Sequence, residues 1–256
     1  MTGGLDTSNL SWEFSGIVTH IGSDVQDLKE GDRVFGLHAG KFGNVTRVPA
    51  EVCQKACGDF EQLATLPFAY CTAFYAIVTV GHAQPGETVL IQSATGGFGM
   101  AAVAVARLQQ ADVYVTAGTQ SKRQMLHDMG IATDHIFDSR NITAYTDLKT
   151  ATGGRGFDLV LNTSSGDYFR SVSWPLVAPF GRFVELKKND ILDKGIISLK
   201  NFNEGATFIP VDMHYICYHK PGILVRLMET VGTMYRTGQI DPLPVQSYSI
   251  DRKSVV

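Results

Sequence analysis

The segment Val89–Ala102, VLIQSATGGFGMAA, decides the fold of this 256-residue chain. Its apolar beginning predicts a short buried strand, and its small residues from Gly97 onward predict a helix. Glycine lets the backbone approach phosphate oxygens, and a helix N-terminus offers free N–H groups with a partial positive charge. We therefore expect the turn between strand and helix to bind the pyrophosphate of a dinucleotide. The residues of this predicted phosphate turn are Ser93, Ala94, Thr95, Gly96, Gly97, Phe98 and Gly99.

The glycine spacing of this turn leaves an alternative open. Gly96, Gly97 and Gly99 do not form a strict G-x-G-x-x-G pattern, so a glycine-lined turn without a ligand also fits the residues. The position of the turn, after the first strand of an alternating series, favours the dinucleotide.

Short apolar stretches alternate with helical ones after residue 86. The expected strands are 89–92, 113–117, 135–137, 157–162, 182–186 and 206–212. The expected helices are 97–109, 121–129, 144–150, 168–176 and 223–237, preceded by one at 61–80. This alternation is typical of an α/β fold whose parallel sheet is covered on both faces. Six strands predict a Rossmann-type doubly wound sheet, and residues 14–37, rich in strand and turn signals, predict a small β-rich region.

Composition excludes several classes of protein. Hydrophobic residues make up 44% of the chain, enough to fold it, and a net charge of −3 gives no basic field for nucleic acid. Residues 1–10 lack the features of a signal peptide. The most apolar helical stretch that we identify, 100–106, is far shorter than the ~20 residues that span a bilayer. We expect a soluble cytoplasmic protein with no nucleic-acid or membrane partner.

The cysteines and histidines show no ligand spacing, so we expect no metal site. The four cysteines, Cys53, Cys57, Cys71 and Cys217, fit reduced and mostly buried thiols.

The end of the second expected strand indicates which dinucleotide binds. An NAD site usually has a carboxylate there for the ribose 2′-hydroxyl, and this chain has none. Two cations with nearby hydroxyls suit the 2′-phosphate of NADPH instead, although a basic, solvated helix start is the alternative. The candidate residues are Gly118, Thr119, Ser121, Lys122 and Arg123.

Four segments carry a resemblance to a known family. They are 63–77 (LATLPFAYCTAFYAI), 89–99 (VLIQSATGGFG), 152–162 (TGGRGFDLVLN) and 181–192 (GRFVELKKNDIL). They resemble the medium-chain dehydrogenase/reductase superfamily. Together with 134–140 (DHIFDSR), the last segment is similar to the enoyl reductase domains of fungal highly reducing polyketide synthases and of fatty acid synthase. The chain lacks the zinc-ligand patterns of the superfamily's alcohol dehydrogenases, so it resembles the zinc-free branch.

The resemblance implies a domain organisation and an activity. Residues 1–60 would be part of a GroES-like substrate domain to which residues 241–256 return, and 61–240 would be the NADP-binding Rossmann domain. Relative to the family, both ends look truncated. The implied reaction is NADPH-dependent reduction of a trans-2-enoyl thioester on an acyl carrier protein, with hydride going to the β-carbon and a proton to the α-carbon. Other synthase domains and a second copy of the chain are further implied partners.

The resemblance also implies roles for individual residues. Lys188 and Asp190 are the candidate proton donors, although a surface ion pair is the alternative for them. Tyr168 stands where fatty acid synthases have a lysine, and we interpret it as a packing or surface residue. The residues matched to positions that line the cofactor are Thr72, Ser139, Asn162, Ser164 and Leu186.

Two other readings fit the residues. A free-standing quinone or enone reductase has the same cofactor and fold. A catalytically inactive NADPH-binding module, or a fragment of a larger polypeptide, would explain why the chain lacks family segments at both ends.

Overall fold

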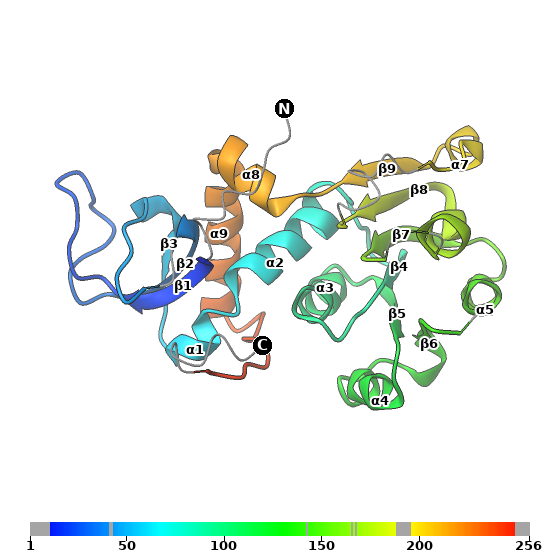
Figure 1. Cartoon of the computed structure of the whole chain (residues 1–256), viewed down its shortest axis with the longest axis horizontal. Coiled ribbons are helices and arrows are strands. Elements are labelled where there is room, and N and C mark those ends of the chain that lie inside the picture. The colour runs from blue at the N-terminus through cyan, green and yellow to red at the C-terminus, as the bar shows by residue number, and fades with distance from the viewer. Residues whose placement is uncertain are drawn as a thin grey trace. The chain divides into compact units, whose positions relative to one another are not determined.

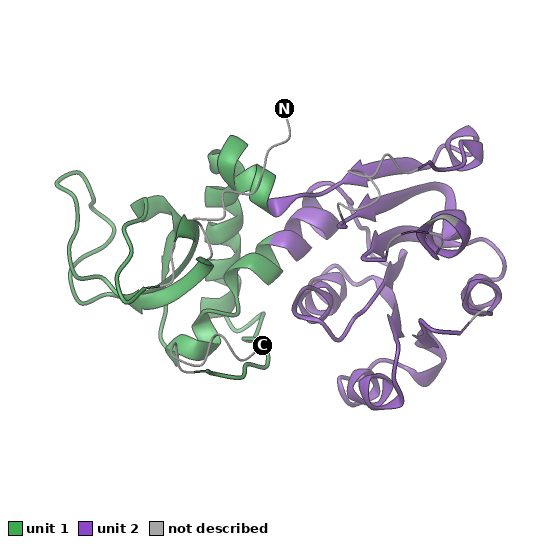
Figure 2. Cartoon of the chain, viewed as in Figure 1, with its two compact units in different colours: residues 1–71, 214–256 green, residues 72–213 purple. Residues whose placement is uncertain are grey.

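The computed structural model describes residues 11–40, 43–141, 143–164, 166, 168–187 and 196–248. The chain divides into two compact units, one of residues 1–71 and 214–256 and the other of residues 72–213 (Figure 2). We describe each unit by itself. The division into a substrate domain and a cofactor domain that meet at residues 60 and 240 stays a prediction.

The unit of residues 72–213 is built on a six-stranded parallel sheet (Figure 1). Its strands are β4 (Thr88–Ile91), β5 (Asp112–Ala117), β6 (Ile136–Asp138), β7 (Phe157–Asn162), β8 (Val177–Glu185) and β9 (Thr207–Pro210). Their order in the sheet is β6-β5-β4-β7-β8-β9, and every neighbouring pair is parallel. The order reverses between β4 and β7, where ligands bind in open α/β sheets. The prediction of a doubly wound six-stranded sheet is confirmed.

Helices lie on both faces of this sheet. In Figure 1, α3 (Gly97–Leu108) lies on one side of β4 and β5, and α5 (Ala144–Ala151) lies on the other. α4 (Gln120–Asp128) packs against β5 and β6. Gly130, which follows the C-cap Met129, has a φ of 80° that suits a residue without a side chain. A π-helix, η4 (Phe169–Ser173), and a 3₁₀ turn, η5 (Trp174–Leu176), pack beside α5.

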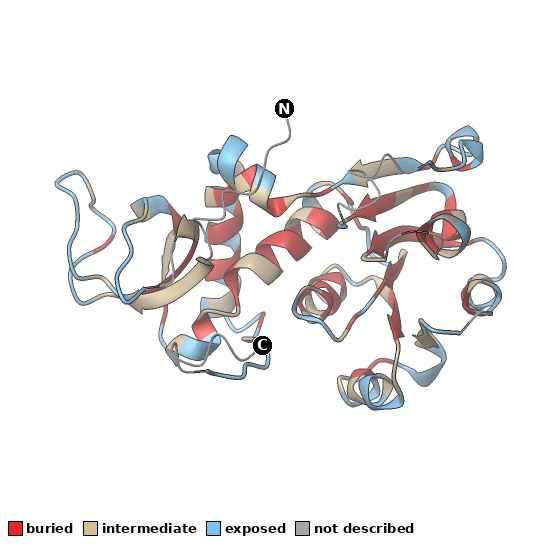
Figure 3. Ribbon diagram, in the orientation of Figure 1, coloured by how far each residue is buried: buried red, intermediate tan, exposed pale blue. Residues whose placement is uncertain are grey.

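One hydrophobic core of this unit lies between the sheet and the layer of α5, η4 and η5. All six residues of β7 are buried, as expected for a central parallel strand, and Figure 3 shows the buried residues following the strands. An aromatic group fills this layer: Tyr114, Phe157, Phe169, Trp174 and Phe183.

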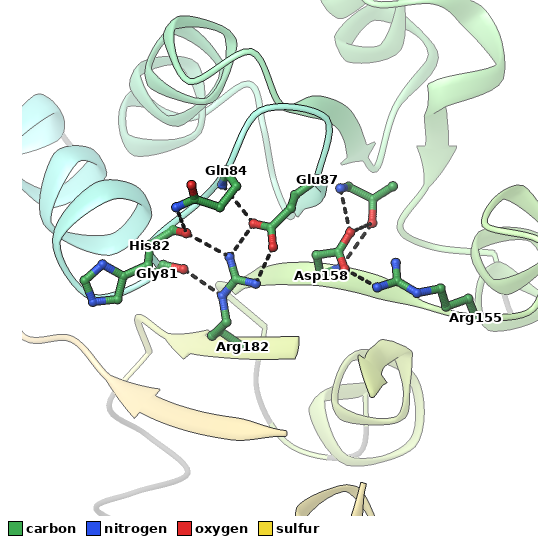
Figure 4. Close-up of polar contacts among 8 residues, drawn as sticks. Gly81, His82, Gln84, Glu87, Arg155, Asp158 and Arg182 are labelled. Atoms are coloured by element: carbon green, nitrogen blue, oxygen red, sulfur yellow. Dashed lines mark hydrogen bonds and ion pairs between the residues drawn. The ribbon is translucent and has the colours of Figure 1, made fainter. Parts of the chain in front are cut away.

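One ion pair joins the residue before β4 to β8, and a second lies at the amino end of β7 (Figure 4). Arg182 in β8 donates to both carboxylate oxygens of Glu87, at 2.9 and 2.5 Å, and to the carbonyl oxygen of Gly81 at 2.7 Å. Asp158 in β7 accepts hydrogen bonds from Arg155 and from the backbone N–H and hydroxyl of Thr88. These contacts connect loop and strand ends that are far apart in the sequence.

The other unit contains a three-stranded antiparallel sheet of β1 (Ser11–Ile17), β2 (Arg33–Gly40) and β3 (Cys53–Lys55), with the turn η1 (Ala50–Val52) before β3. Its helices are α1 (Phe60–Leu63), the first part of α2 (Pro67–Phe74), α8 (Met213–His219, except Met213) and α9 (Pro221–Arg236). α9 packs against β3 and η1, so the helix that closes the alternating series belongs to this unit by its contacts.

Two predicted helices differ from the structure. The helix expected at 61–80 is divided into α1, α2 and a π-helix, η2 (Tyr75–Thr79), and α2 begins at Pro67, which has no N–H to donate. The helix expected at 168–176 is the π-helix η4 followed by η5. The run 60–79 is 20 residues long and, by length and composition alone, apolar enough to cross a membrane, whereas the sequence analysis considered only the shorter stretch 100–106. More than half of its most apolar window is buried inside the protein, as in the core helix of a folded domain.

The segment α7 (Lys200–Asn203) precedes β9. Its Asn201 side chain is buried and donates to the carbonyl oxygen of Trp174 at 2.8 Å. This bond attaches the segment before the edge strand to the aromatic layer.

Candidate functional site

The predicted phosphate turn lies at the carboxyl end of β4, beside the point where the strand order reverses. Ser93 has a φ of 53°, and the N–H of Ala94 donates to the carbonyl oxygen of Thr116 in β5 at 3.1 Å. Gly96 is the N-cap of α3, and no side chain caps that helix. The first N–H groups of α3 therefore remain available for an anion.

The glycines of this turn fit a dinucleotide. A Cβ on Gly99 would lie 2.5 Å from the Cα of Ala94, so only glycine allows the helix to pack this closely on the strand end. A Cβ on Gly96 would meet nothing nearer than 3.6 Å, which leaves exposed backbone that a phosphate can approach. Close packing of helix on strand and close approach of the phosphate are the two roles that different glycines have in a dinucleotide-binding turn.

The second candidate group lies at the carboxyl end of β5. Thr119 caps α4 by accepting a hydrogen bond from the N–H of Lys122, and its hydroxyl lies 3.2 Å from that of Ser121. Arg123 is engaged within the protein: it pairs with Asp138 at 2.9 Å and donates to the carbonyl oxygen of Ala117. Of the two predicted cations, Lys122 is the exposed one.

Arg140 is a cation that the sequence analysis missed. A Cβ on Gly118 would lie 2.8 Å from Nε of Arg140 and 3.3 Å from the hydroxyl oxygen of Ser139, so both side chains approach the end of β5. The Arg140 guanidinium is exposed and makes no hydrogen bond or ion pair with any residue that the structure describes. Ser139 and Arg140 therefore lie together beside Gly118, and Arg140 joins Lys122 as an exposed cation of this region. Arg140 follows the end of β6, the strand next to β5, and this position was the signal that could have identified it from the sequence.

A buried polar network lies at the carboxyl ends of β4, β7 and β8, which are neighbours in the sheet. Gln92, directly after β4, accepts from the N–H of Thr163 at 3.2 Å and donates to Ser173 at 2.5 Å. The Ser164 hydroxyl lies 2.8 Å from Oε1 of Gln92 and 2.7 Å from Oδ1 of Asn162. It has one proton and can donate to only one of these two oxygens.

Glu185 anchors this network. It ends β8, is 1% exposed, and accepts from Nδ2 of Asn162 at 2.7 Å and from the N–H of Lys187 at 2.7 Å. Asn162 also donates to the carbonyl oxygen of Ser164, so two acceptors fix the orientation of its amide. Both N–H groups of the Asn162 amide are therefore engaged within the protein, where they connect the ends of β7 and β8. Sequence reasoning missed Gln92 and Glu185, although a carboxylate inside the apolar strand RFVEL was a usable signal.

The remaining predicted residues are Leu186, Thr72, Lys188 and Asp190. Leu186 follows β8, is half-buried, and donates its N–H to the carbonyl oxygen of Asn162 at 3.1 Å. Thr72 is buried in α2. Lys188 and Asp190, the candidate proton donors, lie outside the described residues.

The sheet order and the glycine turn at its switch point define a nucleotide-binding α/β protein, and comparisons with known proteins agree. A family model described as zinc-binding dehydrogenase matches residues 97–193. The highly reducing polyketide synthase xilA of Penicillium rubens is 41% identical over 245 residues, which are 94% of this chain and 10% of that synthase. The chain thus spans about a tenth of the length of the curated relative.

Two solved structures that resemble this chain are enoyl reductases, a narrower class of protein than the dehydrogenases of the family model. The CurK enoyl reductase is 30% identical with a TM-score of 0.84, over 94% of this chain and 72% of that chain. The nucleotide-binding subdomain of the enoyl reductase domain of PpsC from Mycobacterium tuberculosis is 36% identical with a TM-score of 0.65, over 70% of this chain and 99% of that one. The chain belongs to the enoyl reductases of polyketide synthases, in the medium-chain dehydrogenase/reductase superfamily. This membership makes a nicotinamide nucleotide, NAD(P)H, its cofactor class.

The matching family model is described as zinc-binding, whereas this chain resembles the zinc-free branch of the superfamily. Among the residues with described positions, no three His, Cys, Asp or Glu side chains form a group that could hold a metal ion. The absence of a metal site stays a prediction for the whole chain.

Proposed function

We propose that this chain uses NADPH to reduce the Cα=Cβ bond of a trans-2-enoyl thioester carried by an acyl carrier protein. The observation that carries the proposal is the glycine turn at the switch point of a chain that belongs to the polyketide enoyl reductases. The relatives are multidomain synthases, which supports an acyl carrier protein and other synthase domains as partners.

The preference for NADPH over NADH rests on charge. Lys122 and Arg140 are exposed cations near the end of β5, and the structure places no carboxylate at residues 118–123 for a free ribose 2′-hydroxyl. A phosphate between these cations would make charge-assisted hydrogen bonds with the Arg140 guanidinium, the Lys122 ammonium and the Ser139 hydroxyl.

NADPH, when bound, supplies the hydride that adds to the β-carbon of the enoyl group. The protein's own part is to hold the pyrophosphate on the N–H groups of α3 and to fix the ends of β7 and β8 through Asn162 and Glu185. The α-carbon then needs a proton, for which Lys188 and Asp190 are our candidates. An ammonium that gives this proton takes another from solvent, which completes the balance of one hydride and one proton added.

The activity is tested by following NADPH oxidation with crotonyl-pantetheine, with a crotonyl-loaded acyl carrier protein and with a simple quinone. We expect thioester-dependent oxidation and a butyryl product, identified by mass, and weaker oxidation of NADH. Oxidation with the quinone alone would favour the free-standing quinone reductase. Nucleotide binding with no turnover of either thioester would favour the inactive module, and Lys188→Met and Asp190→Asn test the two proton donors.

A further inference from the structure

Gln92 is a buried amide at the switch point of the sheet. It directly follows β4, is 3% exposed, and directly precedes Ser93, the first residue of the phosphate turn. Burying an amide costs free energy unless its polar atoms are hydrogen-bonded, so its partners show which part of the site it holds. Because the side chain is buried, it acts on a ligand through the residues that it contacts.

The hydrogen bonds of Gln92 lead toward β7 and the helical layer that follows it. Its N–H donates to the carbonyl oxygen of Leu161 at 3.3 Å, and its Oε1 accepts from the N–H of Thr163 at 3.2 Å and lies 2.8 Å from the hydroxyl of Ser164. A backbone N–H can only donate, so the bond from Thr163 fixes which end of the amide is the oxygen. The other end, Nε2, donates to Ser173 of η4 at 2.5 Å. The side chain therefore links the residues after β7 to the end of β4.

The phosphate turn is held from the opposite side by other contacts. The N–H of Ser93 donates to the hydroxyl of Thr116 at 3.2 Å, and the N–H of Ala94 donates to the carbonyl oxygen of the same threonine at 3.1 Å. Thr116 belongs to β5, which lies on the other side of β4 from β7. Loss of the Gln92 side chain would therefore leave these bonds of the phosphate turn in place.

A dinucleotide binds across the switch point, with one nucleotide on each side of it. The adenosine half would lie at the end of β5, where Arg140 approaches Gly118. The nicotinamide half would then lie on the β7 side, where Thr163 and Ser164 are both partly exposed. Gln92 holds these two residues from below.

We propose that Gln92 is a positioning residue for the nicotinamide half of the cofactor and that it acts through Thr163 and Ser164. The inference rests on the proposed function, since it requires NADPH at the switch point. Hydride transfer depends on the placement of the nicotinamide ring, and a misplacement of about 1 Å can cost about 100-fold in rate. Without the Gln92 oxygen, the N–H of Thr163 loses its acceptor, and the hydroxyl of Ser164 keeps only Asn162 among its amide partners.

The test compares Gln92→Met with wild type and with Asn201→Leu. Methionine keeps the length of the side chain and removes its hydrogen bonds. Asn201 is the matched control, because it is also a buried amide of this unit, at 8% exposure, and it donates to the carbonyl oxygen of Trp174 rather than to a residue of the switch point.

Fluorescence titrations use NADPH and reduced nicotinamide mononucleotide, and 2′,5′-ADP, for the adenosine half, is measured by displacement of NADPH. We expect Gln92→Met to weaken NADPH and the mononucleotide about 3- to 10-fold, as for one lost hydrogen bond, and to leave 2′,5′-ADP unchanged. Asn201→Leu should lower Tm and change none of the three affinities.

Turnover separates positioning from a general loss of stability. With crotonyl-pantetheine and saturating NADPH, Gln92→Met should lower kcat about 10-fold and leave KM for the thioester within about 2-fold of wild type. Ser173→Ala is the second variant if Gln92→Met fails to fold. It removes only the acceptor of Nε2, so we expect the same selectivity between the two halves at about 2- to 3-fold.

Two results would overturn the proposal in whichever variant folds. One is an equal loss of affinity for 2′,5′-ADP and the mononucleotide, and the other is an unchanged affinity for the mononucleotide together with an unchanged kcat. Wild type that binds NADPH but turns over neither thioester would instead refute the proposed function, and the titrations would still decide the role of Gln92.

Discussion

Removing the Arg182 guanidinium should destabilise the unit of residues 72–213 more than removing any single exposed cation there. Arg182 is 17% and Glu87 24% exposed at their side chains, and two hydrogen bonds join them. Arg182 also donates to the carbonyl oxygen of Gly81. Arg182→Met keeps most of the aliphatic stem and leaves the carboxylate and the carbonyl without this donor (Figure 4).

The magnitude follows from these contacts. A hydrogen bond to a charged group contributes about 1.5–3 kcal/mol, and partial exposure of the pair reduces that value. We therefore expect Arg182→Met to lower the free energy of unfolding by about 2–4 kcal/mol, and Glu87→Gln by about 1–2 kcal/mol. Arg155→Met is the contrast: its side chain is 55% exposed, so the loss should stay below about 1 kcal/mol.

The assay uses the two tryptophans of the chain. Trp174 is fully buried in this unit, and Trp12 lies in the other. In a Trp12→Phe background, urea unfolding followed by fluorescence reports on the environment of Trp174 alone. The single and double variants at Arg182 and Glu87 then give the coupling energy, which we expect to be about 1–2 kcal/mol.

Acid should abolish the difference between wild type and Glu87→Gln. The hydrogen bond from Arg182 lowers the pKa of Glu87, so its carboxylate stabilises the folded state above the pKa of the unfolded chain. That contribution is lost as pH falls through the lowered pKa of the folded state. The gap in unfolding free energy should be constant from about pH 8 to about pH 6 and should close below about pH 4. A coupling energy of zero, or a gap that persists in acid, would refute this account of the ion pair.

Three further outcomes follow from the carboxyl end of the sheet. Glu185→Gln places an amide N–H₂ group, a donor, against another donor, either Nδ2 of Asn162 or the N–H of Lys187. Urea unfolding should therefore show a free energy of unfolding lower by about 1–3 kcal/mol. An unchanged free energy would mean that the network rearranges without cost. Arg140→Ala should weaken NADPH at least about 10-fold in a fluorescence titration and leave NADH unchanged, and an equal loss for both would contradict a 2′-phosphate contact. Gly99→Ala should remove nucleotide binding and lower Tm, because the new methyl group would lie 2.5 Å from the Cα of Ala94. Normal binding by this variant would show that the backbone of the turn can shift to accommodate the methyl group.

The regular part of the fold was predictable because its local signals agree. Apolar stretches such as Phe157–Asn162, and the glycine turn after β4, specify strand, turn and helix within a few residues of sequence. The three-residue strand β3 was missed, since Cys53–Lys55 is too short to show alternation. The π-helices Tyr75–Thr79 and Phe169–Ser173 have no local signal that separates them from α-helices.

The candidate site was predictable only where its residues follow one another in sequence. Lys122 and Arg123 are adjacent cations, and nothing in their spacing shows that Arg123 pairs with Asp138 whereas Arg140 approaches Gly118 instead. Arg123 can pair with Asp138, and Arg140 can approach Gly118, because β5 and β6 are parallel neighbours. Only the assembled sheet shows that these two strands are neighbours. The contact between Gln92 and Ser164 joins residues 72 apart for the same reason.

The polar groups of the parallel sheet differ between its two ends, and the difference has a physical reason. At the amino ends of β4 and β7, charged pairs such as Arg182 with Glu87 compensate each other and can connect strands permanently. At the carboxyl ends of β4 and β7, the side chains that contact one another are amides and hydroxyls, which hold their geometry without presenting charge to an anionic ligand. Arg140, whose guanidinium pairs with no residue that the structure describes, lies at the edge where a phosphate would compensate it. An end already closed by ion pairs could not accept a dinucleotide, because binding would first have to break them.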